Sequence, residues 1–193
     1  MNKRELGVFG LVVLSLVGLG ACGNLESERL GEQKAPVVYG DDNRLDVYEI
    51  PDSTWATAAL GQVVALMDDS VIVDSDPDNI IIWANTLGDD FDLCAGERFA
   101  DQLDGSSCSS TLIDTDLVLT AGHCMTGPAD CMNTRFVFNY AMQDASTLRT
   151  ITADDLYDCA EILVSEVTNE NEDYAIVRLD RPVAGHTPAV VDT

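Results

Sequence analysis

Short apolar runs, separated by turn residues, dominate the pattern of this chain. Gly, Pro, Asn and Asp interrupt the runs at close intervals, and neither an internal repeat nor a long helical period is present. This pattern is typical of an all-β barrel or sandwich. We expect one short helix at residues 52–60, where Asp52 or Ser53 supplies the cap. The expected strands are residues 62–67, 80–83, 109–113, 117–120, 135–140, 148–151, 159–164 and 174–179.

The first 22 residues have the pattern of an export signal. Lys3 and Arg4 precede an apolar run at residues 8–19 that is too short to span a bilayer comfortably. The run ends in the sequence LGAC, which resembles a bacterial lipobox, and the resemblance implies that Cys22 carries a lipid. An ordinary secretory signal cut near Ala21 is the alternative. Either reading predicts export from a bacterial cell, as an outer-membrane or cell-surface lipoprotein or as a secreted protein.

The remaining chain divides into a polar segment and one folded domain. Residues 23–36 are polar and charged without an apolar period, which predicts a tether or propeptide. Residues 37–193 are long enough for one domain of ordinary size with its own core.

The charge balance restricts the partners. The chain has 10 Lys and Arg residues against 34 Asp and Glu residues, a formal net charge of −24. Nucleic acid is therefore excluded as a partner, because its phosphates need basic side chains. Anionic membrane surfaces are excluded as charge partners for the same reason, so the only membrane contact we expect is the lipid anchor. The acidity fits a well-solvated extracellular protein.

An acidic loop at residues 74–79, with the sequence DSDPDN, suggests a calcium-binding or adhesive surface module as another function. An EF-hand loop needs a bidentate Glu at its twelfth position, and that position is Asn85. We therefore favour a solvated loop and expect no metal and no cofactor.

Six cysteines in a chain of this length fit an oxidising compartment. No CxxC pair is present, so the sequence offers little support for a zinc site. Outside the cysteines, we expect Trp55 and Trp83 to be core or cover residues. His186 lies in a turn-rich tail and is expected to be exposed.

Residues 108–124, CSSTLIDTDLVLTAGHC, contain two strand-like runs separated by a polar turn. The second run presents His123 at its end, beside Cys124. This segment resembles the region around the catalytic histidine of trypsin-like serine proteases, C-[SG]-G-[TS]-L-I followed by W-V-L-T-A-A-H-C. Gly122 replaces the usual second alanine, and Ser110 stands where glycine is usual.

A second segment, DYAIVRL, begins at Asp173 and resembles the protease pattern D-[IL]-A-[IL]-[VL]-x-L. The resemblance implies that His123 acts as general base and that Asp173 orients it. It also implies the trypsin-like fold of two six-stranded antiparallel barrels, of which this chain matches the first. Residues 37–50 resemble the mature start of bacterial glutamyl endopeptidases, which suggests a cut after Pro36 that frees Val37.

The nucleophile of such a triad is not found in the printed sequence. No Gly-x-Ser-Gly turn is present, and neither Ser nor Cys follows Asp173. Ser106 and Ser107 precede the histidine and are not expected to be nucleophiles. We therefore expect the N-terminal part of a serine endopeptidase acting on polypeptide substrates, with the second barrel missing and its contact face bare. The alternative is a catalytically inactive, protease-like surface lipoprotein that binds a partner.

The resemblance also bears on cysteine pairing. It implies a bridge between Cys108 and Cys124, and we expect a second one between Cys131 and Cys159. Cys94 could instead pair with either of the latter, or with a cysteine beyond Thr193.

Overall fold

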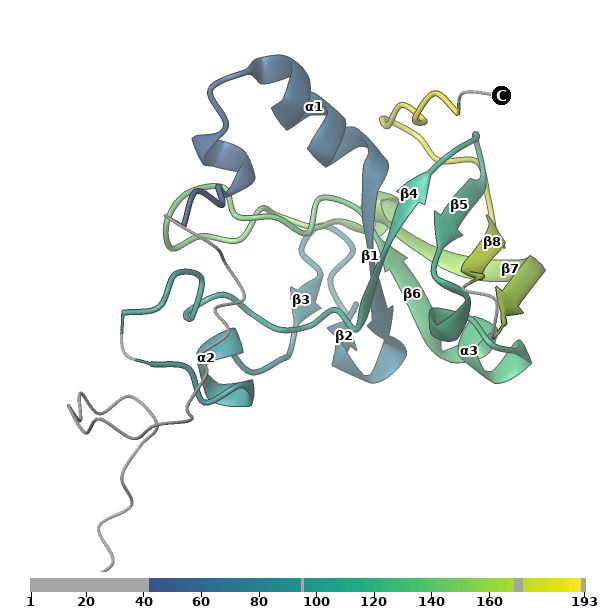
Figure 1. Ribbon diagram of the computed structural model, residues 1–193, viewed down its shortest axis with the longest axis horizontal. Helices are drawn as coiled ribbons and strands as arrows, with labels where there is room; N and C mark the ends of the chain where they lie inside the picture. The colour runs from purple at the N-terminus through teal and green to yellow at the C-terminus, as the bar shows by residue number, and fades with distance from the viewer. Residues whose placement is uncertain (1–41, 95, 169–171, 192–193) are drawn as a thin grey trace, which may run out of the picture. The chain divides into compact units, whose positions relative to one another are not determined.

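A computed structural model describes residues 42–94, 96–168 and 172–191 (Figure 1). Its centre is a closed six-stranded barrel in which every neighbouring pair of strands is antiparallel, with the order β1-β4-β5-β8-β7-β6. The all-β antiparallel barrel expected from the sequence is thus confirmed. The strands are β1 (Val63–Asp68), β4 (Cys108–Leu112), β5 (Leu117–Thr120), β6 (Thr134–Val137), β7 (Leu156–Val167) and β8 (Asp173–Leu179).

Smaller elements surround this barrel. A two-stranded sheet pairs β2 (Ile72–Val73) with β3 (Ile81–Ile82). The α-helices are α1 (Ser53–Gln62), α2 (Leu87–Asp90) and α3 (Pro128–Asn133), and the 3₁₀ turns are η1 (Val47–Glu49), η2 (Asp69–Val71), η3 (Gly122–Cys124) and η4 (Ala153–Asp155). Within the described residues, no helix has the length and apolarity that crossing a membrane requires.

Helix α1 begins as its sequence predicts, because the Asp52 side chain accepts a hydrogen bond from the Thr54 backbone N–H at 2.8 Å. Helix α3 begins at Pro128, a position that needs no N–H donor. Asp130 accepts hydrogen bonds from the backbone N–H groups of Thr126 and Gly127, which satisfies donors at this helix start.

The strand expected at residues 148–151 is wrong. Leu148 and Ile151 form only isolated bridges, to Met142 and Ile80 respectively. Strand β7 is longer than expected, since its pairing with β8 continues to Val167 through two irregularities in register. A strand's length depends on its neighbour, which the apolar pattern of one segment does not specify.

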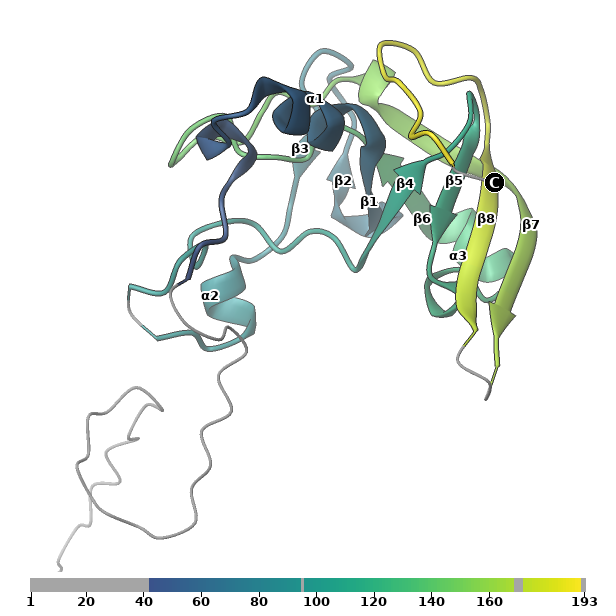
Figure 2. The same ribbon diagram turned by 45° about the horizontal axis from the view of Figure 1, so that its top comes forward.

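The barrel core consists of the side chains that point inward from the strands, where inward-facing and outward-facing residues alternate. On β8, Ala175, Val177 and Leu179 are buried, whereas Tyr174, the second residue of the strand, is exposed. These side chains pack with residues of β1, β4, β5, β6 and β7, and with the residues directly after η3 and β6, in one cluster of buried residues: Val64, Leu66, Leu112, Val118, Met125, Phe136, Phe138 and Tyr157. Figure 2 shows β8 lying between β5 and β7, which is the arrangement that matters for the site.

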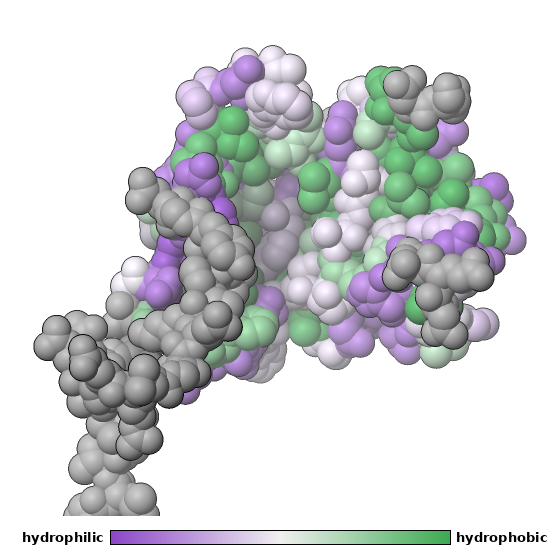
Figure 3. Space-filling view, in the orientation of Figure 1, coloured by the Kyte–Doolittle hydropathy of each residue, from purple (hydrophilic) through white to green (hydrophobic). Residues whose placement is uncertain are grey.

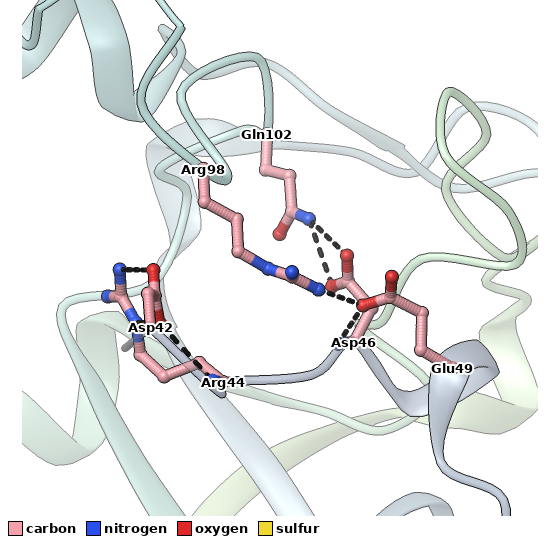
Figure 4. A network of polar contacts seen from close by, with 6 residues as sticks. All are labelled: Asp42, Arg44, Asp46, Glu49, Arg98 and Gln102. Atoms are coloured by element: carbon pink, nitrogen blue, oxygen red, sulfur yellow. Dashed lines mark hydrogen bonds and ion pairs between the residues drawn. The ribbon is translucent and has the colours of Figure 1, made fainter. Parts of the chain in front are cut away.

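The first described residues are held against the loop that precedes β4 (Figure 4). The Gln102 side-chain amide donates to both carboxylate oxygens of Asp46, at 2.9 and 3.0 Å. Arg98 forms an ion pair with Glu49, the last residue of η1. The guanidinium groups of Arg98 and Arg44 also lie near the Phe99 ring, at 4.9 and 5.1 Å from its centroid.

Both tryptophans differ from expectation, since Trp55 is 70% exposed and Trp83 is 78% exposed. Helix α1 buries none of its residues fully, and the alternation at β3 turns Ile82 inward and Ile81 and Trp83 outward. The expectation that His186 is exposed is also wrong. Its side chain is 9% exposed, because its ring packs on Phe138 with centroids 4.3 Å apart.

Candidate active site

His123 lies in the 3₁₀ turn η3, directly after strand β5. A disulfide between Cys108 and Cys124 ties this turn to the start of β4, with Cα atoms 6.3 Å apart. In the loop-entropy model such a short closed loop stabilises the fold by about 3 kcal/mol. The bridge also restrains the backbone that carries the imidazole.

Asp173 is brought to His123 by strand pairing rather than by sequence proximity. It is the first residue of β8, opposite Val167 at the end of β7. On the other side, β8 pairs with β5 so that Ala175 faces Thr120. Continuing this antiparallel register past Thr120 brings the η3 turn to Asp173.

Each oxygen of the Asp173 carboxylate contacts one nitrogen of His123. Oδ1 accepts the His123 backbone N–H at 2.9 Å, and Oδ2 lies 2.7 Å from the imidazole Nδ1. The side chains are 63% and 43% exposed for His123 and Asp173 respectively. The pair is therefore open to a reactant from outside the barrel.

The hydrogen bond from the His123 backbone N–H, followed by that from its side chain, lowers the pKa of Asp173 below its usual value. The carboxylate is thus ionised at neutral pH. A carboxylate accepts hydrogen bonds only, so its contact with Nδ1 requires a proton on that nitrogen. In the neutral imidazole this leaves the lone pair on Nε2, which can take a proton from a hydroxyl group.

One group of possible metal ligands occurs among the described residues: atoms of Cys108, His123 and Cys124 lie within 4.8 Å of one another. The two sulfurs are joined in the disulfide, so neither is a thiolate that a metal requires. In the acidic loop at residues 74–79, Asp76 accepts the backbone N–H of Asp78 and so caps its own turn.

The remaining residues considered from the sequence lie apart from this pair or outside the described residues. A second disulfide joins Cys131 of α3 to Cys159 of β7, which excludes either as the partner of Cys94. Cys94 is not a free thiol.

The hydroxyl of Ser106 donates a hydrogen bond to the Cys108 carbonyl oxygen at 2.6 Å, so this serine is engaged with the barrel wall. Cys22 and Val37 lie outside the described residues.

Sequence reasoning did not identify Ser165 of β7, whose hydroxyl donates to the carbonyl oxygen of Gly122 at 3.2 Å. A serine on a strand carries no signal of such a contact. The glycine at position 122, where alanine is usual, was the one indication in the sequence that this turn is closely packed.

Residues 95–190 match the family model described as Trypsin. The match covers β4 to β8 and therefore both His123 and Asp173. No match was found among curated proteins. Together with the closed antiparallel barrel, the family match identifies the fold as that of trypsin-like serine proteases. Residues 95–190 of this chain therefore form a trypsin-family domain.

Proposed function

We propose that this chain is part of a serine-type endopeptidase in which His123 is the general base and Asp173 the residue that orients it. The observation that carries the proposal is the 2.7 Å contact between His123 Nδ1 and Asp173 Oδ2 on a trypsin-family barrel. Families of this kind act on polypeptides, and the exposed imidazole leaves Nε2 accessible to the hydroxyl of a serine nucleophile.

In the proposed reaction, a serine hydroxyl attacks the carbonyl carbon of the scissile peptide bond while Nε2 of His123 takes its proton. Asp173 stabilises the resulting imidazolium. The proton then passes to the leaving amine, and water hydrolyses the acyl-enzyme by the same route. We assign the serine, the oxyanion hole and the specificity pocket to a second barrel beyond the printed residues.

Exposed apolar side chains on the barrel support a covering partner. Leu119 on β5, Tyr174 on β8 and Val190 in the C-terminal segment are 40%, 39% and 97% exposed respectively. Apolar residues gather over this part of the barrel in Figure 3. An apolar patch of this kind favours burial against another protein surface. We infer that the second barrel covers it.

The first test is to sequence the native reading frame past the codon for Thr193 and to express the whole product. We expect a further Gly-x-Ser-Gly turn, hydrolysis of peptide substrates and loss of that hydrolysis in His123→Ala. The 193-residue chain alone should be inert. Hydrolysis that survives His123→Ala would refute the triad.

A second candidate function is that of an inactive, protease-like surface protein that binds a partner. The exposed Trp55 and Trp83 favour it, because large aromatic side chains are enriched at binding surfaces. A reading frame that stops at Thr193, together with a soluble and cooperatively melting monomer, would support this candidate over the protease. Loss of partner capture in Trp55→Ser and Trp83→Ser would then identify the surface.

We propose that the chain has three parts: a lipoprotein signal at residues 1–22, a tether or propeptide at 23–36 and the protease domain at 37–193. The short apolar run and the Cys22 context support the anchor, and the disulfides fit an oxidising, extracellular location. Failure of a palmitate analogue to label the protein would refute the anchor, as would a mapped disulfide between Cys22 and Cys94. N-terminal sequencing of the secreted form tests the cut before Val37 and, with it, the glutamyl-endopeptidase branch.

A further inference from the structure

Gly122, directly before the histidine, has no room for a side chain. A Cβ atom at this position would lie 2.3 Å from the carbonyl oxygen of Glu166 and 2.9 Å from a methyl group of Val167. Gly122 is buried and its backbone does not lie in the left-handed region. Space, not backbone conformation, therefore requires glycine here.

The atoms that crowd Gly122 belong to the end of β7, which is also the strand that places Asp173. Val167 is the cross-strand partner of Asp173, and Glu166 is the partner of Tyr174. The hydroxyl of Ser165 on the same strand donates to the Gly122 carbonyl oxygen. One close backbone approach thus joins the turn that carries His123 to the strand pair that carries Asp173.

We propose that Gly122 is a positioning residue, whose close contact with the end of β7 sets the distance between His123 and Asp173. The proposal rests on the proposed function for its catalytic meaning, but the geometry that it explains exists without a nucleophile. An ordinary van der Waals separation is 3.5–4.0 Å, so an added methyl group would move the turn away from β7 by about 1 Å. A displacement of this size costs about 100-fold in the rate of a positioned reaction.

The test uses the intact 193-residue chain and a spectroscopic signature that does not depend on hydrolysis. The chain has two histidines, so labelling with ¹⁵N-histidine gives a simple spectrum, and His186→Gln assigns it. At alkaline pH the nitrogen shifts report which ring nitrogen carries the proton. We expect the Nδ1–H form of His123 in the unmodified chain and a large share of the Nε2–H form in Gly122→Ala. Asp173→Asn provides the reference in which the contact with a carboxylate is lost.

Gly127→Ala is the matched control, because a Cβ atom there meets nothing within 4 Å and the backbone is extended. This variant should keep the Nδ1–H form. An unchanged His123 signature in Gly122→Ala would overturn the proposal. If Gly122→Ala does not fold, Ser165→Ala decides, since it removes the hydrogen bond to Gly122 without adding bulk. A partial gain of the Nε2–H form in that variant supports the proposal, and the unmodified signature overturns it.

The result also separates this proposal from the proposed function. If Gly122→Ala changes the His123 tautomer but the complete protein does not hydrolyse peptides, the positioning role of Gly122 stands and the protease assignment fails. If the protein is an active protease and Gly122→Ala keeps both the Nδ1–H form of His123 and full activity, the protease assignment stands and the positioning role fails.

Discussion

The carboxylate of Asp173 contacts His123 twice, through the backbone N–H at 2.9 Å and through the imidazole Nδ1 at 2.7 Å. The backbone contact holds the turn and the side-chain contact holds the ring. Because one group makes both contacts, a displacement of the strand that carries Asp173 alters the position and the orientation of the imidazole together.

Replacing Asp173 by Asn should therefore reduce catalysis much more than folding. In the complete protease we expect the turnover number to fall about 10⁴-fold, because the amide favours the wrong tautomer of His123. Thermal unfolding should change little, since both side chains are substantially exposed. Peptide hydrolysis and circular dichroism on the same samples measure the two effects. A variant with near-normal turnover would contradict the role of Asp173.

The two disulfides should contribute similarly to stability and differently to the site. Cys108 and Cys124 are separated by 16 positions, and Cys131 and Cys159 by 28, so replacing either pair by alanine should cost about 3–4 kcal/mol in unfolding free energy. Only loss of the first pair should alter the His123 ring signals, because Cys124 adjoins His123. Urea unfolding and ¹⁵N-histidine spectra separate these effects. Equal spectral changes in both variants would contradict the expectation.

His123 and His186 form a natural comparison for stability. The side chain of His186 is 9% exposed and packs on Phe138, whereas that of His123 is 63% exposed. His186→Ala should lower the unfolding free energy by about 1–2 kcal/mol, because it removes a buried ring and its aromatic contact. His123→Ala should change it by less than about 0.5 kcal/mol. Denaturant titration of both variants gives the answer, and similar values for the two would show that the burial of His186 contributes nothing.

Asp130 should produce part of the acid sensitivity of the fold. Hydrogen bonds from the Thr126 side chain and backbone lower the pKa of Asp130 below its ordinary value. A carboxylate whose folded pKa is lowered contributes stability above its unfolded pKa of about 3.9, and this contribution is lost as the pH falls through the folded value. Asp130→Asn should therefore be less stable than the unmodified chain at pH 6, and the difference should begin to narrow as the pH falls below about 4. Urea midpoints measured from pH 2 to 6 test this, and a difference independent of pH would contradict it.

The ion pair between Arg98 and Glu49 should hold the residues before α1 against the loop that follows α2. Arg98→Ala should speed hydrogen exchange at the Ile50 amide about 5-fold, the equivalent of about 1 kcal/mol for a partly exposed pair. Arg178→Ala is the matched control. Arg178 pairs with Glu161 on the barrel, and its loss should leave the Ile50 amide unchanged. Equal exchange in both variants would show that Arg98 does not hold this segment.

Local patterns in the sequence were sufficient for the barrel class and for the region of the site. The apolar runs at residues 109–113 and 117–120 and the polar turn between them predicted β4 and β5 closely. The Asp52 cap predicted the start of α1. These features depend on neighbouring residues along the chain, so periodicity and capping chemistry describe them well.

Tertiary structure decided what depends on atoms distant in the sequence. Three features differ from the sequence-based expectation: the absence of a strand at residues 148–151, the burial of His186 on Phe138, and the exposure of Trp55 and Trp83. The space that excludes a side chain at Gly122 comes from Glu166 and Val167. The sequence alone determined that a histidine follows β5 and that an aspartate begins β8. The distance between His123 and Asp173 was determined only by the packing of β7 against the η3 turn and β8. Close contacts of this kind depend on strand register and on steric fit, which no single segment encodes.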